Sequence, residues 1–438
     1  MNASDAELME QARAVLAANW IGASTKPSPR LYPHQWSWDS AFIAIGYAHY
    51  DQPRAEQELR SLFAAQWSNG LLPHIVFNPA ASAYFPGPEA WQTSVSNHAS
   101  QQPRTTGIVQ PPVHATAALH MFRYAPDQER ARAFLIDLFP HLRDWHAYLY
   151  RERDPHKEGL VYIEHPWESG QDNSPLWDAA LERITIADEQ LPPYQRVDTT
   201  IVDANDRPTK TEYDRYMFLV QQLIDRGYDD SRIRADYPFL IQDVLFNTLL
   251  CQANRDLAEI ARIVGEPAES FERWAEQTAG AINAKLWDEQ HGTYINFDLV
   301  ANAPIDVHVA AGFTPLFAGI PDQDRAERLY SYLNSPAFCP LGGAIYPVAC
   351  YDRQAPGYSP SRYWRGPVWI NVDWLIYHGL RRYGFSEYAG WMRQRIVELV
   401  RLHGFFEHFS PETGEGHGTG DFSWTAALLL DLLYRPDN

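Results

Sequence analysis

Residues 241–267 read IQDVLFNTLLCQANRDLAEIARIVGEP, and this stretch carries the pattern that decides the fold. Gly265 and Pro267 end the pattern, because glycine adopts the left-handed conformation at a helix C-terminus and proline cannot continue a helix. Before them, apolar side chains recur every three to four residues, as on the buried face of a helix: Val244, Leu245, Leu249, Leu257, Ile260 and Ala261. The spacing predicts a helix over 241–264.

A second helix follows at once, over 269–286. Its apolar face comprises Phe271, Trp274, Ala275, Thr278, Ile282 and Leu286. The same periodicity predicts helices at about 5–19, 38–48, 53–66, 111–124, 128–150, 212–225, 304–317, 323–334, 367–382, 386–402 and 421–434. Extended patterns are confined to 160–163 and 292–297, which we expect to form loop hairpins. The sequence therefore predicts an all-α fold, in which consecutive helix pairs would suit a closed ring of hairpins.

Two long stretches, residues 69–106 and 180–210, lack helical periodicity. Both are polar and interrupted by proline, and neither has the composition of a flexible linker. Long irregular segments inside a domain are often functional loops that cover a site. We therefore predict one domain over residues 1–438, with lid insertions near 69–106 and 180–210.

The charge and composition narrow the class of partner. The chain has 36 basic and 55 acidic side chains, a net charge of −19, which disfavours nucleic acids and anionic membranes. No signal peptide precedes the first helix and no apolar run is long enough to span a bilayer, so we expect a cytoplasmic protein. Its three cysteines are widely spaced, without a CxxC pair, and suggest buried thiols instead of disulfides or a zinc site.

Aromatic residues form 13% of the chain, and many fall in four polar segments that also carry carboxylates and glycines. These segments are residues 31–39 (LYPHQWSWD), 167–178 (WESGQDNSPLWD), 363–369 (YWRGPVW) and 406–414 (FEHFSPETG). All four lie at the edges of predicted helices, where side chains can reach a shared site. A hydrophobic core does not require this combination.

Asp172 lies in the most informative of these segments, between Trp167 and Trp177. Neighbouring indoles exclude water from a carboxyl group and raise its pKa, which a general acid needs near neutral pH. The alternative is structural: Glu168 and Asp178 would cap a helix and Asp172 would bond a nearby backbone amide. The residue chemistry leaves both interpretations open.

Glu407 precedes a glycine-dense loop that leads into the last predicted helix. A carboxylate there would lie at the mouth of a barrel. A metal site is the alternative, because His403, His408 and His417 lie near Glu407, Glu412, Glu415 and Asp421. No recognised ligand spacing such as HExxH occurs, so the sequence favours a carboxylate site without metal.

A pair of carboxyl groups among aromatic side chains is typical of glycoside hydrolysis. One carboxyl group protonates the leaving oxygen, and the second activates water or attacks carbon. Aromatic rings can stack on sugar faces, and the candidates for this are Trp36, Trp38, Tyr84, Trp91, Trp167, Trp177, Trp364 and Trp369. Alternatives of other classes are a non-catalytic sugar-binding barrel and a sugar epimerase, but epimerases of this kind rely on paired histidines.

The motifs, taken in order, resemble glycoside hydrolase family 63, and within it the short bacterial enzymes that hydrolyse glucosylglycerate or mannosylglycerate. The resemblance covers nearly the whole chain. It rests on YPHQWSWD, NGLLPHI, GIVQPPVHA, WESGQDNSPLWD, EYDRY, RYWRGPVW, EHFSPETG and FSWTAA. Gln171 and His408 are positions where we expect other residues to be common in relatives.

The resemblance implies an (α/α)6 barrel and an inverting mechanism without a cofactor or a metal. Asp172 would be the general acid and Glu407 the general base. Their carboxyl groups should lie about 6.5–9.5 Å apart, with room for a water molecule on the far face of the sugar. The expected partner is a small α-glycoside; the sequence leaves the oligomeric state open.

The resemblance also assigns sugar-binding positions. Asp39 would bind sugar hydroxyls, and Arg215 would lie nearest the aglycone, where a glycerate carboxylate needs a bidentate partner. Arg365 is as well explained by a structural ion pair. The full set of binding residues is Tyr32, Trp36, Trp38, Asp39, Tyr84, Gln110, Trp167, Arg215, Tyr363, Arg365 and Trp369. Glucosylglycerate is the first expectation for the substrate, with mannosylglycerate, glucosylglycerol and short α-gluco-oligosaccharides as alternatives.

Overall fold

A closed inner ring of six helical elements forms the centre of the molecule. The computed structural model describes residues 4–81, 84–187 and 191–434. Each inner element packs against the next, and the last returns to the first. In chain order they are α2 (Ser37–Tyr47), α5 (His114–Tyr124), α10 (Val244–Val264), the 3-10 helix η7 (Ala310–Leu316), α13 (Ile370–Arg382) and α15 (Ser423–Tyr434).

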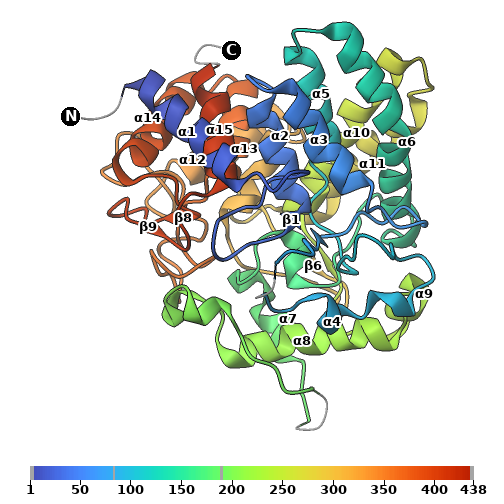
Figure 1. The fold of residues 1–438 in the computed structure, drawn as a ribbon. Helices are drawn as coiled ribbons and strands as arrows, with labels where there is room; N and C mark the ends of the chain where they lie inside the picture. The colour runs from blue at the N-terminus through green and yellow to red at the C-terminus, as the bar shows by residue number, and fades with distance from the viewer. Residues whose placement is uncertain (1–3, 82–83, 188–190, 435–438) are drawn as a thin grey trace.

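An outer ring of helices covers the inner one. Its members alternate with the inner elements along the chain: α1 (Asp5–Asn19), α3 (Gln52–Phe63), α6 (Gln128–Glu152), α11 (Glu269–Ala281), α12 (Gln323–Leu333) and α14 (Ser386–His403). Each outer helix packs on at least one inner element through its apolar face, whereas every residue of α2 is buried. This arrangement is an (α/α)6 barrel, which confirms the predicted all-α fold (Figure 1).

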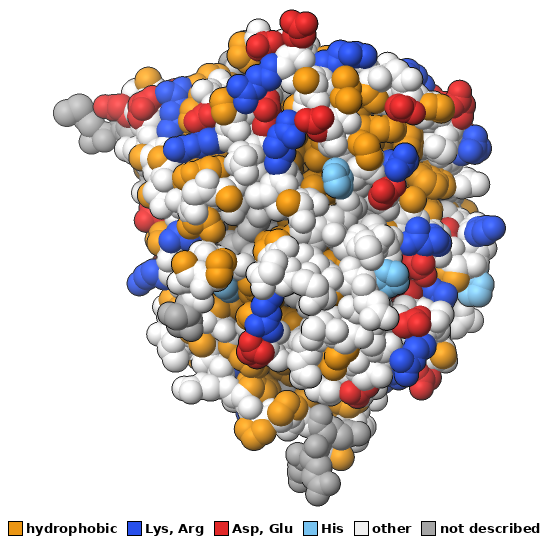
Figure 2. Space-filling model, turned by 45° about the vertical axis from the view of Figure 1, so that its right-hand side comes forward, with side chains coloured by type: hydrophobic (Ala, Val, Ile, Leu, Met, Phe, Trp, Pro, Cys, Tyr) orange, Lys and Arg blue, Asp and Glu red, His pale blue; other side chains and the backbone are white. Residues whose placement is uncertain are grey.

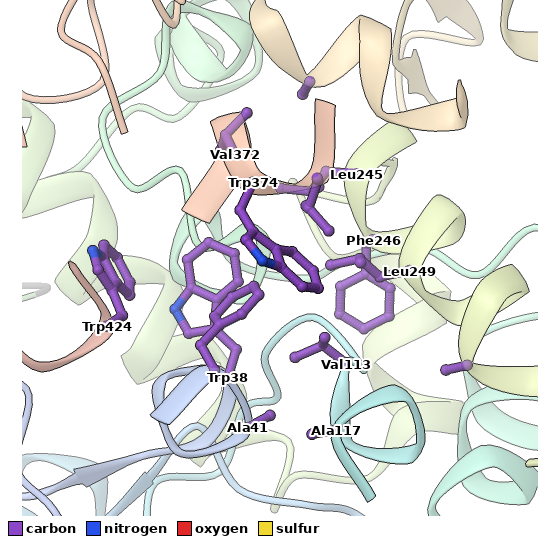
Figure 3. Packing of buried hydrophobic residues seen from close by; sticks show 14 of the residues in the cluster. Trp38, Ala41, Val113, Ala117, Leu245, Phe246, Leu249, Val372, Trp374 and Trp424 are labelled. Carbon is purple, nitrogen blue, oxygen red and sulfur yellow. The ribbon is translucent and has the colours of Figure 1, made fainter. Parts of the chain in front are cut away.

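Large apolar side chains fill the axis of the barrel. Trp38 of α2 and Trp374 of α13 each pack against the ring of Phe42, with 5.7 and 6.2 Å between ring centres, and Figure 3 shows both tryptophans among the side chains of the axis. Close packing of α2 on α15 also requires a residue without a side chain at Gly46, because a Cβ there would lie 2.5 Å from the Cα of Ala427. The axis is therefore a packed core and not a pore.

The connections differ at the two ends of the barrel. Turns from an inner to an outer element are three to six residues long. The return connections are long, and all lie at the end where the inner elements begin: residues 20–36, 64–113, 153–243, 282–309, 334–369 and 404–422. They include the helices α4 (Pro88–Trp91), α7 (Asp178–Glu182), α8 (Lys210–Asp225) and α9 (Asp230–Asp236), seen below the barrel in Figure 1.

Short antiparallel strand pairs lie in these long connections, some within one connection and some between two. β1 (Gln35–Trp36) pairs with β2 (Ile75–Val76), β4 (Trp287–Asp288) with β5 (Thr293–Tyr294), and β8 (His408–Phe409) with β9 (Gly416–His417). β6 (Phe297–Asp298) lies between β3 (Ile241–Gln242) and β7 (Ala303–Pro304). Of these pairs, β1–β2 joins the connections 20–36 and 64–113, and β3–β6 joins 153–243 to 282–309.

The structure corrects two predicted helices and places short helices in both predicted lid segments. The helix expected from residue 241 begins at Val244, because residues 241–242 form β3 and Asp243 caps the helix through its side chain. The helix expected over 304–317 is a 3-10 helix over Ala310–Leu316, in which Pro315 removes a backbone donor. The predicted lid segments contain short helices, and their residues 82–83 and 188–190 lie outside the described parts.

A buried cluster around Arg153 fastens two of the long connections, 64–113 and 153–243. The guanidinium donates to Asp230 (Nε–Oδ1, 2.9 Å) and to Glu168 (Nη1–Oε2, 3.0 Å), and pairs with Glu164 (Nη2–Oε2, 2.8 Å). Glu168 also accepts the backbone N–H of Val109 at 3.0 Å, in the connection before α5. Because Arg153 and Glu168 are fully enclosed, the segments around 109 and 168 are held in fixed register.

Within the described residues, no helix has the length and apolar character needed to cross a bilayer. On the face shown in Figure 2, acidic and basic side chains are interspersed over the helices, and no broad basic patch stands out.

We expect Arg153→Met to lower the free energy of unfolding by about 3–5 kcal/mol, because three carboxylates would stay buried without their cation. Urea denaturation at pH 7 measures this change. Arg143→Met on the same helix α6 is the matched control, because Arg143 pairs with Asp144 at the surface and such pairs contribute about 0–1 kcal/mol. Equal losses in the two variants would contradict the role given to the Arg153 cluster.

Candidate active site

Two adjoining cavities lie at the loop end of the barrel and share Tyr32, Trp36, His74, Asp172 and Tyr363 in their walls. The first, the barrel cavity, has an empty volume of about 370 Å³ and is also lined by Pro27, Trp38, Asp39, Gln110, Gly170, Trp364, Trp369, Glu407, Phe422 and Trp424. The second, the lid cavity, measures about 670 Å³, and its further lining includes Tyr84, Trp91, Trp167, Val197, Asp198, Arg207 and Tyr213. Aromatic side chains make up much of the wall of both cavities.

Local backbone geometry presents Asp172 to both cavities. Gly170, two residues earlier, has φ +72°, and a Cβ there would lie 2.4 Å from the ring of Trp38, so both the conformation and the space require glycine. The hydroxyl of Tyr216 donates to the carbonyl oxygen of Asp172 at 2.8 Å. These contacts fix the main chain and leave the carboxyl group directed to the cavities.

The surroundings of Asp172 favour its protonated form. Burial raises the pKa of Asp172 to about 7, the nearby charge of Glu407 acts in the same direction, and Arg207 opposes them. At neutral pH a large fraction of the group therefore holds a proton. Asp172 has the property that a general acid needs.

Glu407 is held differently. It is 1% exposed, and its Oε1 accepts hydrogen bonds from Tyr32 (2.7 Å) and Tyr363 (3.3 Å). Its Oε2 is buried and has no hydrogen-bond partner among the described residues. Burial raises the pKa of Glu407, while Arg207 and the two tyrosine hydroxyls lower it. One oxygen is thus fixed, and the other can accept a proton.

Arg207 lies beside both carboxyl groups. Its Nη1 donates to the hydroxyl of Tyr32 at 3.3 Å, its Nε donates to Asp198 at 3.2 Å, and the guanidinium lies 4.2 Å from the ring centre of Tyr363. The side chain forms part of the lid cavity wall. It supplies a positive charge next to that cavity.

Polar and aromatic groups complete the barrel cavity. Burial raises the pKa of Asp39 well above its ordinary value, and the charge of Glu407 adds to this effect. Gln110 accepts the backbone N–H of Trp38 at 3.2 Å, which orients its amide. Trp364 and Trp369 stack at 3.8 Å between ring centres. A flat, hydroxylated ring would find both apolar surfaces and hydrogen-bonding groups here.

Most of the residues singled out in the sequence line these cavities, but Arg215, Arg365 and the stacking candidate Trp177 do not. Arg215 lies on α8 and borders a separate surface hollow with residues from 182–200. Arg365 forms ion pairs with Asp178 and, at 3.3 Å, with Glu212, which is the structural alternative left open by the sequence. The residues brought together are Tyr32, Trp36, Trp38, Asp39, Tyr84, Gln110, Trp167, Asp172, Tyr363, Trp369 and Glu407.

Sequence reasoning missed several lining residues. His74 and Trp424 lie inside the quoted motifs NGLLPHI and FSWTAA, so a signal for them existed. Burial keeps the pKa of His74 well below its ordinary value, so the ring is neutral. Arg207 had no motif of its own, although it lies in the predicted lid segment 180–210.

The histidines considered for a metal site have packing contacts instead. His408 stacks on Trp369 with 4.7 Å between ring centres and on His417 with 5.9 Å. In the described parts of the chain, they form no group of three potential ligands with the acidic residues of this loop. The predicted lid segments supply His74, Tyr84 and Arg207 to the cavity walls, and their role as lids stays a prediction.

Comparison with known proteins gives consistent matches. The family profile of the mannosylglycerate hydrolase MGH1-like glycoside hydrolase domain matches residues 32–425. A mannosylglycerate hydrolase of Rubrobacter radiotolerans is 55% identical over 98% of this chain and 97% of its own length. A glucosylglycerate hydrolase of Mycolicibacterium hassiacum is 37% identical over 98% of both chains.

Among solved structures, a GH63 mannosylglycerate hydrolase from Thermus thermophilus, crystallised with Tris and D-glycerate, superposes with a TM-score of 0.91. It is 44% identical, and the match covers 97% of this chain and 99% of that one.

We expect Tyr32→Phe to move the acid limb of the pH profile of kcat/KM to higher pH. The hydroxyl of Tyr32 donates a hydrogen bond to the ionised form of Glu407, so the loss of this hydroxyl raises the pKa of Glu407. As the pH falls, Glu407 is then protonated, and inactive as a base, at a higher pH. The alkaline limb, which reports Asp172 near pH 7, should stay in place. Steady-state rates from pH 4 to 9 measure both limbs.

Tyr363→Phe should produce a smaller shift, because its hydroxyl is 3.3 Å from Glu407 instead of 2.7 Å. Tyr84→Phe is the control: Tyr84 lines the lid cavity but is not among the hydrogen-bond donors of Glu407 in the described structure. An acid limb that does not move in Tyr32→Phe would argue against Glu407 as the titrating base.

Proposed function

The chain belongs to the mannosylglycerate hydrolase MGH1-like glycoside hydrolases of family GH63, and from this premise we propose that it hydrolyses the α-glycosidic bond between a small sugar and glycerate with inversion. The observation that carries the proposal is the pair of carboxyl groups, Asp172 and Glu407, in the wall of one aromatic cavity. They differ in their hydrogen-bond partners, which supports two different roles.

The barrel cavity suits the sugar. Several indole rings, those of Trp36, Trp38 and Trp364 among them, contribute apolar surface to its wall, and Asp39 and Gln110 offer groups for hydroxyls. Asp172 borders both cavities, so a glycosidic bond that crosses from one cavity to the other would pass beside it. Its proton goes to the glycosidic oxygen as the bond to the anomeric carbon breaks.

Glu407 then acts as the base. A water molecule attacks the anomeric carbon from the opposite face, and its proton passes to the free Oε2 of Glu407. The bonds of Tyr32 and Tyr363 to Oε1 stabilise the ionised carboxylate before the reaction. The products are the β-anomer of the sugar and free glycerate.

The lid cavity suits the aglycone. Arg207 in its wall is a guanidinium that can bind a carboxylate in a bidentate manner. The related GH63 enzyme crystallised with D-glycerate supports a glycerate site in this fold. We therefore assign the aglycone carboxylate to Arg207 instead of Arg215, which borders a different hollow.

Two sugars are candidates for the glycone. Mannosylglycerate comes first, because relatives with that name include one 55% identical to this chain. Glucosylglycerate, the expectation from the sequence, is the second candidate and is supported by the relative that is 37% identical.

Proton NMR during hydrolysis of α-mannosylglycerate and α-glucosylglycerate tests the reaction. We expect the β-anomer of the free sugar to accumulate first. Asp172→Asn and Glu407→Gln should each lower kcat by about 10²–10⁴-fold, the usual contribution of a general acid or base. Glu412→Gln, in the same hairpin as Glu407 but bordering neither cavity, should keep normal activity. Initial release of the α-anomer would indicate a retaining mechanism. Full activity of Asp172→Asn or of Glu407→Gln would exclude that residue from the mechanism.

A second experiment tests the aglycone site. Arg207→Gln should lower kcat/KM for glycosylglycerate relative to the neutral glycosylglycerol by about tenfold or more, or 1.4 kcal/mol, because only the first substrate carries a carboxylate. The ratio of the two values cancels general effects on catalysis. Arg215→Gln is the matched control and should leave this ratio unchanged. If Arg215→Gln lowered the ratio and Arg207→Gln did not, the carboxylate site would belong to Arg215.

A further inference from the structure

One of the six long connections contributes no described residue to either cavity wall. It is the segment 282–309 between α11 and η7. This segment carries a cluster of Asp288, His291, Asp306 and His308, whose potential ligand atoms all lie within 4.8 Å of one another. We refer to these four residues as the aspartate–histidine cluster.

The cluster joins parts of the segment that are separate in sequence. Asp288 ends β4, His291 lies in the β4–β5 turn, and Asp306 and His308 follow β7. His291 Nδ1 is 2.5 Å from Asp288 Oδ2. The side chains of Asp288 and His308 are 15% and 12% exposed, whereas that of Asp306 is 78% exposed. The cluster is thus enclosed on one side and open to solvent on the other.

A hydrogen-bond chain fixes the tautomer of His308. The hydroxyl of Tyr332 donates its hydrogen to Asp352 Oδ2 at 3.0 Å, so its oxygen accepts from His308 Nδ1–H at 2.8 Å. In the neutral ring the lone pair is then on Nε2. That nitrogen is buried, has no hydrogen-bond partner among the described residues, and points into the cluster.

The lone pair of Nε2 faces negative charge. The nitrogen lies 3.3 Å from Asp306 Oδ1 and 3.8 Å from Asp288 Oδ2. A lone pair and two carboxylates at these distances repel one another unless a cation lies between them. Metal-binding histidines commonly donate their other ring N–H to an oxygen, as His308 does to Tyr332.

We propose that the aspartate–histidine cluster binds a first-row divalent cation, for which Zn²⁺ is the best fit. Two imidazole nitrogens and two carboxylate oxygens make the four-ligand set typical of Zn²⁺, whereas Ca²⁺ and Mg²⁺ favour oxygen ligands alone. The charge also matches, since two carboxylates and two neutral rings carry −2. The open side at Asp306 gives the ion a path from solvent.

The ion has a structural role. It ties the β4–β5 hairpin to the segment after β7, and through Tyr332 and Asp352 it connects both to α12 and the following loop. Val309, next to His308, bridges to Tyr351 in that loop. The cluster therefore stabilises the connection before η7 and takes no part in the bond cleavage proposed above.

Isothermal titration of ZnCl2 into EDTA-treated, dialysed protein at pH 7.5 tests the site. We expect one equivalent to bind, and Asp306→Asn and His308→Ala each to weaken binding at least tenfold. Tyr332→Phe should weaken it by about tenfold without removing a ligand, as loss of a partner that orients a ligand does. Zn²⁺ should raise the Tm of the unaltered protein but not that of Asp306→Asn. CaCl2 should give no comparable binding.

His156→Gln is the control, since His156 is an exposed histidine outside the cluster. It should bind Zn²⁺ as the unaltered protein does. Asp306 is mostly exposed, so Asp306→Asn should fold normally. If His308→Ala does not fold, Zn²⁺ binding by Asp306→Asn decides the test. Absence of a saturable site, equal Zn²⁺ binding in Asp306→Asn, or equally tight Ca²⁺ binding would overturn the proposal.

Discussion

The inner helices are enclosed between the packed axis and the outer helices, and this enclosure limits where functional side chains can lie. Their middles face either the packed axis or the outer helices, so a polar group there needs a buried protein partner, as Asn254 of α10 has in His146 at 2.8 Å. Functional side chains are therefore restricted to the ends of these helices. The short turns close one end, and the long connections leave the other as the place for a site.

The same scarcity of water gives the two carboxyl groups their chemistry. Burial raises the pKa of both Asp172 and Glu407, which alone would make them alike. Their neighbours separate them: Glu407 accepts from two tyrosine hydroxyls that favour its charged form, whereas the fixed contact of Asp172 is to its main chain. An acid and a base can therefore be made from similar side chains by the donors around them.

The sequence predicted the helices because amphipathic periodicity marks them directly, and the observed α1, 5–19, matches its predicted range. The resemblance to a known family implied that the helices close into a barrel. It failed at Ala310–Leu316, where apolar residues suggested an α-helix and tertiary packing favours a 3-10 helix with an internal proline. Residues in dense motifs, such as Asp39, Asp172 and Glu407, could be found. Arg207 could not be found in this way. Only the fold places Arg207 beside Tyr32 and Arg215 at a different hollow.

The position of Arg207 has a consequence for selectivity. This one cation forms part of the wall of the lid cavity and also lowers the proton affinity of Glu407. A negative group bound in that cavity would offset part of the guanidinium charge, so the base would become stronger only when an acidic leaving group is in place. Recognition of one half of a ligand and reactivity toward the other half would then be thermodynamically linked. Such linkage would discriminate against neutral glycosides even when they bind.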